Sequence, residues 1–288
     1  MHFYGDVFVF SFRVDGAFRT FQFNKFGDNL DREKYFYALS KVLDGEHKRA
    51  GIGTYGEKTV HSVLKNYFEP FEDSHEQKIG GFIADIVGEN GIIEIQTAGF
   101  DRLRKKLAAF LEVSDVTVVY PIPYNKWLIP IDPESGNMGR KRKSPKKGSP
   151  YDIFPELYKI KPFLSNERLH FCIVMLDVEE YRQPPETTGL KRGRRRGSTR
   201  YDRIPIALCD ELHFDKLSDW LYFVPNGLGE EYTSKDLSAK AGIHVSSAQL
   251  TLNILTALGV TERIGKQGNR YLYKTVIQTD EEIFPPHA

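Results

Sequence analysis

Residues 84–100, ADIVGENGIIEIQTAGF, are the segment that most constrains how this chain folds. Two apolar runs of strand-like composition flank the turn pair Asn90-Gly91, and this pattern predicts a β-hairpin. Because strand side chains alternate between two faces, polar residues at every second position gather on one face. The polar residues that interrupt the apolar runs and share a face in this way are Asp85, Glu94 and Gln96.

The register of the hairpin decides which of these side chains meet. A two-residue loop pairs Asp85 with Gln96, whereas a four-residue loop over residues 88–91 pairs Asp85 with Glu94. Directly paired side chains have Cβ atoms about 4.5–5.5 Å apart, so two ionised carboxylates repel each other unless a cation lies between them. Mg²⁺ suits this position because it prefers carboxylate and carbonyl oxygens. The other interpretation is the solvent-facing polar side of an amphipathic hairpin.

The formal net charge of +1 hides two strongly basic segments. Residues 139–149 hold six Lys or Arg and no acid, and residues 191–203 hold seven against one Asp. Gly, Ser and Pro favour loops in both segments, which are either solvated or in contact with a polyanion, whose neutralised phosphates release counterions. A nuclear address in a eukaryotic cell also stays open. The candidate phosphate contacts are Arg140, Lys141, Arg142, Lys143, Lys146, Lys147, Arg194, Arg195 and Arg196.

Composition and cysteine usage exclude several classes of protein. The 288 residues are 40% hydrophobic and 27% charged, as in globular domains, and no apolar run approaches the roughly 18–20 residues of a membrane span. The N-terminus lacks a basic leader and a small-residue cleavage site, so we do not expect a signal peptide. Cys172 and Cys209 lie far apart and match no metal spacing. We therefore expect a cytoplasmic protein without a disulfide scaffold and without membrane contact.

Hydrophobic patterning predicts three consecutive parts. Residues 1–48 form a hairpin around Asp15-Gly16 and a helix that ends at Gly45, and they serve either dimerisation or extension of a sheet. Residues 49–214 alternate helix, hairpin, helix and strand, including two strands within residues 116–132. We expect an α/β core here, with a mixed central sheet flanked by helices.

Residues 215–288 read as helix, turn, helix and hairpin, the order of a winged helix-turn-helix. Thr233 and Asp236 supply capping-box chemistry for the first helix. Small polar residues and cations on the second helix and the hairpin suit contact with a DNA groove and phosphates, and the alternative is protein contact or dimerisation. The candidate contacts are Ser246, Ser247, Gln249, Lys266 and Arg270, with His244 and Asn253 also near the start or outer face of the second helix.

The quoted elements resemble the core of the PD-(D/E)XK nuclease superfamily, which has the restriction-endonuclease-like fold. The matching pieces are Glu57 in GEKTVHSVL, Asp85 in IADIV, and Glu94-Ile95-Gln96 in IIEIQT, followed by a basic helix. Residues 51–275 also resemble a family of uncharacterised bacterial proteins thought to carry this core. The resemblance implies a restriction-endonuclease-like core with a C-terminal winged helix.

The resemblance also implies a site and a reaction. Asp85, Glu94 and the Ile95 carbonyl would bind Mg²⁺ or Mn²⁺, Glu57 would support the metal, and Gln96 would orient water. Gln96 departs from the usual Lys, whose charge another lysine would then supply. Arg104 and Lys105 would contact nucleic acid, and the candidates for the missing charge are Lys58, Lys78, Lys105 and Lys106.

The implied function is metal-dependent hydrolysis of phosphodiesters in nucleic acid, with double-stranded DNA as the expected substrate and a homodimer as a possible assembly. Two alternatives stay open. One is a non-catalytic DNA-binding protein with a degenerate nuclease fold. The other is an interaction protein that dimerises through its winged helix and whose basic loops are merely solvated.

Overall fold

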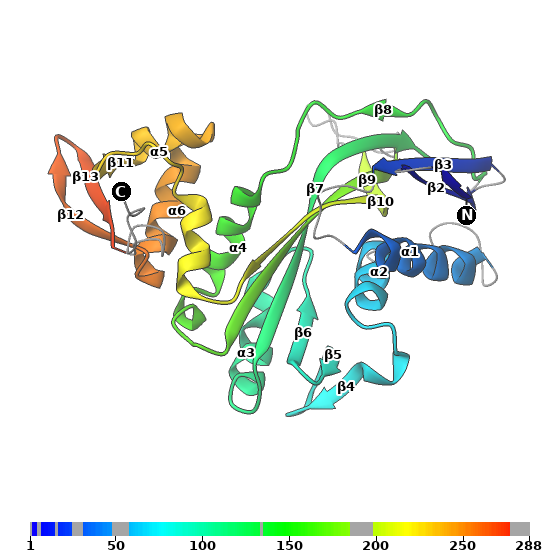
Figure 1. The fold of residues 1–288 in the computed structure, drawn as a ribbon, viewed down its shortest axis with the longest axis horizontal. Helices are drawn as coiled ribbons and strands as arrows, with labels where there is room; N and C mark the ends of the chain where they lie inside the picture. Colours follow the sequence, from blue (N-terminus) through cyan, green and yellow to red (C-terminus); the bar gives the residue numbers. More distant parts are fainter. Residues whose placement is uncertain are drawn as a thin grey trace, which may run out of the picture. The chain divides into compact units, whose positions relative to one another are not determined.

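A computed structural model gives the fold of the protein (Figure 1). It describes residues 2–4, 7–14, 17–24, 31–47, 58–132, 135–184 and 198–276, with side chains described from residue 31 onward except for residues 45–47 and 58. Several predicted features lie outside the described residues, namely Glu57, the turn Asp15-Gly16, and the arginines Arg194, Arg195 and Arg196.

A large mixed sheet is the main feature of the fold. Its strands follow the order β10-β9-β7-β6-β5-β4, with β8 paired to β7. The pairs β4–β5, β5–β6 and β7–β8 are antiparallel, whereas β6 and β7 are parallel. This mixed sheet with flanking helices confirms the predicted α/β class. The strands span His75–Ile79 (β4), Phe82–Gly88 (β5), Gly91–Ile95 (β6), Val116–Pro130 (β7), Arg142–Lys143 (β8), Leu169–Gln183 (β9) and Thr199–Phe214 (β10).

Strand β7 is one strand where the sequence predicts two. Pro121 and Pro123 lie in its middle and lack the N–H that a strand donates to its neighbour. Residues two apart direct their N–H groups to the same edge, so both prolines affect one edge only. Pairing with β6 reaches only to Val119, and pairing with β8 begins at Trp127. The prolines thus fall between these two pairings, and the strand continues through them.

The chain divides into two compact units. The first unit comprises residues 1–72, 123–147 and 176–210, and the second comprises residues 73–122, 148–175 and 211–288. Strands β7, β9 and β10 contribute residues to both. The predicted division of the sequence into three consecutive parts stays a prediction.

The first unit holds an N-terminal sheet and two helices. Strands β1 (His2–Tyr4), β2 (Val7–Val14) and β3 (Ala17–Asn24) form this sheet, and the β2–β3 pairing confirms the predicted hairpin. Helix α1 (Arg32–His47) continues through Gly45, so the predicted glycine cap is wrong: glycine permits a left-handed cap without requiring it. Val60, Val63, Leu64, Tyr67 and Phe68 recur at helical spacing, which predicts one apolar face for the helix that they occupy. The structure confirms this face on α2 (Lys58–Phe68): the first four side chains are buried and Phe68 is half-buried.

Helices of the second unit bury the faces that their periodicity predicts. A 3-10 turn (Phe100–Leu103) leads into α3 (Arg104–Phe110), and a second turn leads into α4 (Phe154–Lys159). The spacing of the leucines and phenylalanine in residues 100–112 predicts that they face the core and that Lys106 lies largely outward. All four predicted core residues of α3 and its flanks are buried, which confirms this face: Leu103, Leu107, Phe110 and Leu111.

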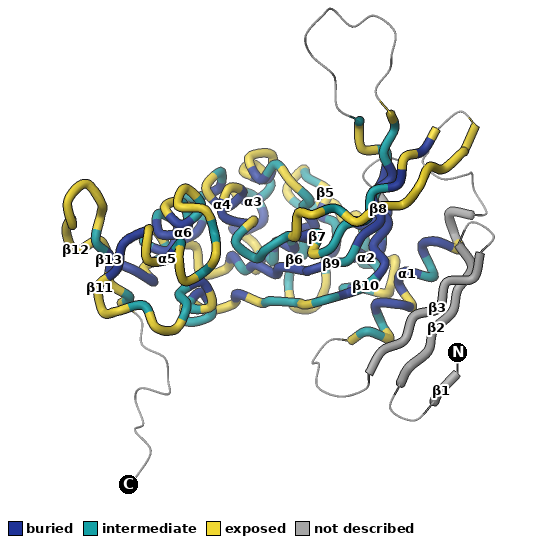
Figure 2. The backbone as a smooth tube through the Cα atoms, turned by 90° about the horizontal axis from the view of Figure 1, so that it is seen from above, coloured by how far each residue is buried: buried dark blue, intermediate teal, exposed yellow. Residues whose placement is uncertain are grey.

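The C-terminal part of the second unit has the predicted order of elements. Strand β11 (Glu231–Thr233) precedes α5 (Ser234–Ala241) and α6 (Val245–Leu258), and β12 (Thr261–Gln267) and β13 (Arg270–Thr275) follow. The predicted capping box is confirmed, because the Thr233 N–H donates to Asp236 at 2.8 Å and the Thr233 side chain accepts from Lys235. Figure 2 shows the β12–β13 hairpin as largely exposed. A winged helix in the functional sense stays a prediction.

Gly91 fixes the turn of the predicted hairpin. Gly88 pairs with Gly91, so the loop residues are Glu89 and Asn90, one position earlier than the predicted Asn90-Gly91 turn. Gly91 has a φ of 108°, and a Cβ atom there would lie 2.5 Å from the carbonyl oxygen of Asp115. Glycine is therefore required by the close approach of the segment that leads into β7, as well as by the positive φ.

We predict that Gly91→Ala lowers the free energy of unfolding by about 2–4 kcal/mol, because it adds a steric clash to backbone strain. Gly81→Ala is the matched control: its φ is 84°, but nothing lies within 4 Å of an added Cβ. That control should lose only about 1–2 kcal/mol. Urea denaturation of both variants measures the difference, and equal losses would contradict the role assigned to Asp115.

Candidate functional site

The hairpin has the register in which its two carboxylates face each other. The pairs Ile86–Ile93 and Val87–Ile92 continue by one step to Asp85 opposite Glu94. Of the two predicted registers, the structure therefore selects the one with direct carboxylate pairing. At this pair, side-chain oxygens accept hydrogen bonds from backbone N–H groups of the neighbouring strand. Glu94 Oε1 accepts the Asp85 N–H at 3.2 Å, and Asp85 Oδ2 accepts the Ile95 N–H at 2.8 Å.

Glu94 is buried, with only 1% of its surface exposed. The alternative of a solvent-facing polar side is therefore wrong for this residue. Burial and the negative charge of Asp85 raise the pKa of Glu94 from 4.5 to about 7, and Lys106 opposes this shift. A carboxyl group in such surroundings is short of positive charge, because ionisation without a counterion costs desolvation energy.

Lys106 supplies one positive charge to this pair. Its Nζ lies 2.8 Å from Glu94 Oε2 and 3.1 Å from Oε1, so the ammonium group binds both oxygens. The sequence placed Lys106 on the outward face of its helix and left four lysines as candidates for the missing charge. The structure identifies Lys106 as a lysine at the site, half-buried, whereas Lys78 and Lys105 are exposed and the Lys58 side chain lies outside the described residues.

Gln96 lies just beyond the end of β6. Its backbone N–H donates to the Val119 carbonyl at 2.9 Å, and its side-chain amide donates to the carbonyl of Ala98. The amide nitrogen is thus engaged by the chain itself. Its oxygen is the atom with which Gln96 would accept a hydrogen bond from water.

The donor set at the hairpin fits a hard divalent cation. Asp85 and Glu94 face each other, and the raised pKa of Glu94 reflects a need for positive charge that Lys106 meets only in part. The Ile95 carbonyl belongs to the residue whose N–H already binds Asp85. Carboxylate and carbonyl oxygens are what Mg²⁺ prefers, and it commonly uses only one or two protein carboxylates. These residues would therefore hold Mg²⁺ or Mn²⁺.

The basic residues of α3 take different positions. Arg104 donates from Nε to the carbonyl of Lys159 at 2.6 Å, so it joins α3 to the end of α4. Lys105 is exposed. Arg104 is exposed as well, so both predicted nucleic-acid contacts are accessible.

The first basic segment lies along β7 instead of forming only a loop. Residues 142–143 form β8 and pair with β7, and the Nζ atoms of Lys141 and Lys143 each lie 5.3 Å from the Trp127 ring centroid. Lys147 similarly lies 5.0 Å from the Tyr124 ring. Such cation–π contacts order lysines that composition alone assigns to a solvated loop. Arg140, Arg142 and Lys146 are exposed on the same segment.

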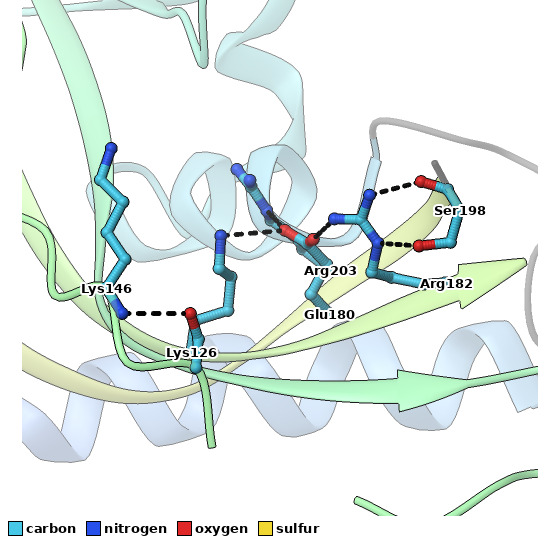
Figure 3. Close-up of polar contacts among 7 residues, drawn as sticks. Lys126, Lys146, Glu180, Arg182, Ser198 and Arg203 are labelled. Carbon is cyan, nitrogen blue, oxygen red and sulfur yellow. Dashed lines mark hydrogen bonds and ion pairs between the residues drawn. The ribbon is translucent and has the colours of Figure 1, made fainter. Parts of the chain in front are cut away.

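Two consecutive buried glutamates on β9 organise the cations of the first unit. Lys141 pairs with Glu179 at 2.6 Å. On the opposite face, Glu180 contacts three cations (Figure 3): Arg203 at 2.8 Å, Lys126 at 3.7 Å, and Arg182. Three positive charges against one negative charge leave a net +2 around Glu180.

The charges of this cation cluster shift the pKa values of its members. Burial lowers the pKa of Lys126; Glu180 opposes the shift, and Arg203, Arg182 and Lys146 add to it. Burial would raise the pKa of Glu180, but the Arg203 hydrogen bond and the surrounding charges bring it below its ordinary value. Sequence reasoning missed Lys126 and Arg182. The pattern Glu180-x-Arg182, inside a nearly continuous apolar strand, was the available signal.

The predicted DNA contacts of the C-terminal part are partly accessible. Ser246 and Gln249 are exposed and Ser247 is half-buried, all near the start of α6, where the His244 ring caps the helix by accepting the Ser246 N–H. Asn253 is half-buried and accepts a 2.9 Å hydrogen bond from Lys161, so its side-chain oxygen is already engaged by the chain. On the hairpin, Lys266 and Arg270 are exposed, and Lys266 lies 5.1 Å from the Tyr271 ring.

We predict that Glu94 makes the metal-free protein less stable as the pH rises. Its folded pKa of about 7 exceeds the ordinary 4.5, so the folded state keeps a proton that the unfolded state loses. The contribution of Glu94 to the free energy of unfolding is therefore fully present below about pH 4.5. It is lost as the pH rises toward 7, by up to about 3 kcal/mol. Urea denaturation in EDTA should show this slope in the wild type and its loss in Glu94→Gln.

Glu89→Gln is the control for this prediction, because Glu89 is an exposed carboxylate in the same hairpin. It should keep the wild-type slope. A slope that is identical in Glu94→Gln and the wild type would contradict the prediction.

Comparison with known proteins places the chain in a family without assigning an activity. A family model described as "Domain of unknown function (DUF8091)" matches residues 58–215, from the start of α2 to just past the end of β10. An uncharacterized protein of Treponema pallidum (strain Nichols) is 30% identical over 243 residues, which cover 82% of this chain and 92% of that relative. No solved structure matches. No helix in the described part of the chain combines the length and apolar character needed to cross a membrane.

The family match contains the carboxylate hairpin, Lys106 and the cation cluster around Glu180, and it covers more than half of the chain. The relative from Treponema pallidum extends the similarity to most of the sequence. The protein therefore belongs to the DUF8091 family.

Proposed function

We propose that this protein is a metal-dependent nuclease that hydrolyses phosphodiester bonds in nucleic acid, with duplex DNA as substrate. The observation that carries the proposal is the pairing of half-buried Asp85 with buried Glu94, with Lys106 at its side. Two facing carboxylates, one with a pKa raised to about 7, form a site that a cation would stabilise. The cytoplasmic location and the homodimer expected from the sequence belong to the same proposal.

The residues of the hairpin and of α3 have different roles in the proposed reaction. A bound Mg²⁺ would supply Lewis-acid polarisation and a more acidic water. Asp85 and Glu94 hold the cation, and the Ile95 carbonyl adds an uncharged oxygen. Lys106, already bound to Glu94, places a positive charge where negative charge develops on the phosphate, the role that the usual Lys at position 96 would have. The Gln96 side-chain oxygen accepts a hydrogen bond from the attacking water.

Cations of the first unit support a nucleic-acid partner. The first unit offers two groups of cations: the net +2 around Glu180, and the lysines ordered on the partly exposed Trp127 and the exposed Tyr124. Phosphate contacts to such cations dominate nucleic-acid affinity, and aromatic rings add stacking. Lys266 and Arg270 on the C-terminal hairpin, and Ser246 at the start of α6, would add contacts if this part acts as a winged helix.

A non-catalytic DNA-binding protein is the second candidate. It is favoured by two contacts at the hairpin: Lys106 already pairs with Glu94, and the Gln96 amide donates to the Ala98 carbonyl. In such a protein, Lys106 would be a permanent counterion that makes the metal unnecessary. The experiment below separates the two candidates.

We predict that the protein cuts supercoiled plasmid in Mg²⁺ or Mn²⁺ and not in EDTA. Asp85→Asn and Glu94→Gln should lose at least about 100-fold in cleavage rate, because they remove charge from the metal ligands. Lys106→Met should lose about 10²–10³-fold, the usual loss for one electrostatic stabiliser of the transition state. Gel assays under single-turnover conditions measure these rates.

Glu89→Gln, on the turn of the same hairpin, is the control and should cut as the wild type does. DNA binding in EDTA should be unchanged in Asp85→Asn. Linear, single-stranded and RNA substrates are included, and no cutting of any of them with DNA binding intact would support the non-catalytic candidate instead.

We also predict that DNA binding changes the fluorescence of Trp127. Trp127 is partly exposed beside Lys141 and Lys143, whereas Trp220 is buried among aromatic rings. Trp127→Phe should abolish the signal while a gel-shift assay still detects binding.

The salt dependence of the same signal tests the lysines. The double variant Lys143→Ala, Lys147→Ala should reduce the slope of log K against log salt by about 0.9 for each lost phosphate contact on duplex DNA. Lys41→Ala, which removes a lysine paired with Glu72, is the control. An unchanged slope in the double variant would contradict the phosphate role of this segment.

A further inference from the structure

A second group of ligand-type side chains lies on β9 and β10, within the second unit. Cys172 on β9 and His213 on β10 approach with Sγ and Nε2 4.0 Å apart, and His213 Nε2 lies 2.7 Å from Glu211 Oε1. The three donor atoms all lie within 4.8 Å of one another. Glu211 and His213 share a strand face because they are two residues apart. Two neighbouring strands thus bring a thiol, an imidazole and a carboxylate close together.

These distances are close to those of a tetrahedral zinc site. Zn–S bonds of about 2.3 Å and Zn–N or Zn–O bonds of about 2.0–2.2 Å place ligand atoms about 3.4–3.6 Å apart. The Cys172–His213 separation exceeds this range by about 0.4 Å, and the Glu211–His213 separation falls short by about 0.7 Å. Side-chain movements of a few tenths of an ångström would bring these two pairs into range. Cys172 Sγ and the Glu211 carboxylate lie within 4.8 Å of each other, so that pair would have to close by up to about 1.2 Å.

The chemistry of the donors selects the class of metal. A thiolate and an imidazole favour borderline ions such as Zn²⁺, whereas Mg²⁺ prefers oxygen ligands only. This set therefore differs in kind from the oxygen donors of the hairpin. Three protein ligands also leave one position for water, as in zinc sites that are not closed.

The surroundings are negative and allow entry from solvent. His213 is 49% exposed along its side chain, so an ion can reach the cluster from that side. The Glu211 hydrogen bond and charge, with Asp215 and Asp219, raise the pKa of His213 despite burial. Asp215 also approaches His170, two residues before Cys172, at 3.9 Å from the ring. Asp215 thus contacts His170 and acts on His213 through its charge, which adds to the negative surroundings of the cluster.

We propose that Cys172, Glu211 and His213 bind one Zn²⁺ ion, with water as the fourth ligand. The ion joins the β9 and β10 segments of the second unit and is separate from the metal proposed for the hairpin. The proposal does not depend on nuclease activity.

Cobalt substitution of the purified full-length chain tests this proposal. After chelation and dialysis, titration with Co²⁺ should give a thiolate-to-cobalt charge-transfer band that saturates at one thiolate-bound ion per chain, and Zn²⁺ should then remove this band. Cys172→Ser should lose the band. Cys209→Ser is the matched control and should retain the band, because Cys209 is the other cysteine of the chain and lies on β10, the strand next to β9.

His213→Gln is a second ligand variant, which keeps the proposal testable if the buried Cys172→Ser substitution prevents folding. It changes a half-exposed side chain and should weaken Co²⁺ binding by more than the about 10–100-fold that changes outside the ligand set cause. Zn²⁺ should raise the thermal unfolding midpoint of the wild type and of Cys209→Ser but not of His213→Gln. Absence of a thiolate band in the wild type, or its persistence in Cys172→Ser, would overturn the proposal.

Discussion

Both units of this protein contain a buried carboxylate, Glu94 or Glu180, whose negative charge must be compensated. An ionised carboxyl group removed from water requires positive charge and hydrogen-bond donors, or it takes up a proton. Glu94 meets this need through Lys106 and the Asp85 N–H, and Glu180 meets it through Arg203, Lys126 and Arg182. The two cases differ in sign. Glu94 remains short of positive charge, with a raised pKa, whereas Glu180 is surrounded by an excess of cations, with a lowered pKa.

These opposite imbalances suit opposite ligands. A site short of positive charge favours a cation, and a site with surplus positive charge favours an anion such as a phosphate. The proposed nuclease, which would position a metal ion and bind a nucleic-acid backbone, would need both. Buried ion pairs with surplus charge contribute little to stability, because desolvation offsets much of their Coulomb energy. The charge left over is therefore more naturally explained by binding than by folding.

Much of the site was accessible from the sequence because strands obey a period of two. The alternation in residues 84–96 placed Asp85 and Glu94 on one face in either register. It did not choose the register, since the turn signal Asn90-Gly91 favoured the wrong loop. Gly91 serves a close approach to the Asp115 carbonyl, which lies 24 positions further along the chain and leaves no mark on the local pattern. The helix α3 was likewise predicted, yet Lys106 was placed on its outward face.

The sequence by itself determined the α/β class, the hairpins, the buried faces of α2 and α3, and the capping box at Thr233. Each depends on residues a few positions apart, whose geometry is fixed by strand and helix periodicity. Only the tertiary structure decided which cation reaches which carboxylate. Lys106 meets Glu94 across 12 positions, Arg203 meets Glu180 across 23, and Cys172 meets His213 across 41. Such pairs form when packing brings elements together, so no local pattern encodes them.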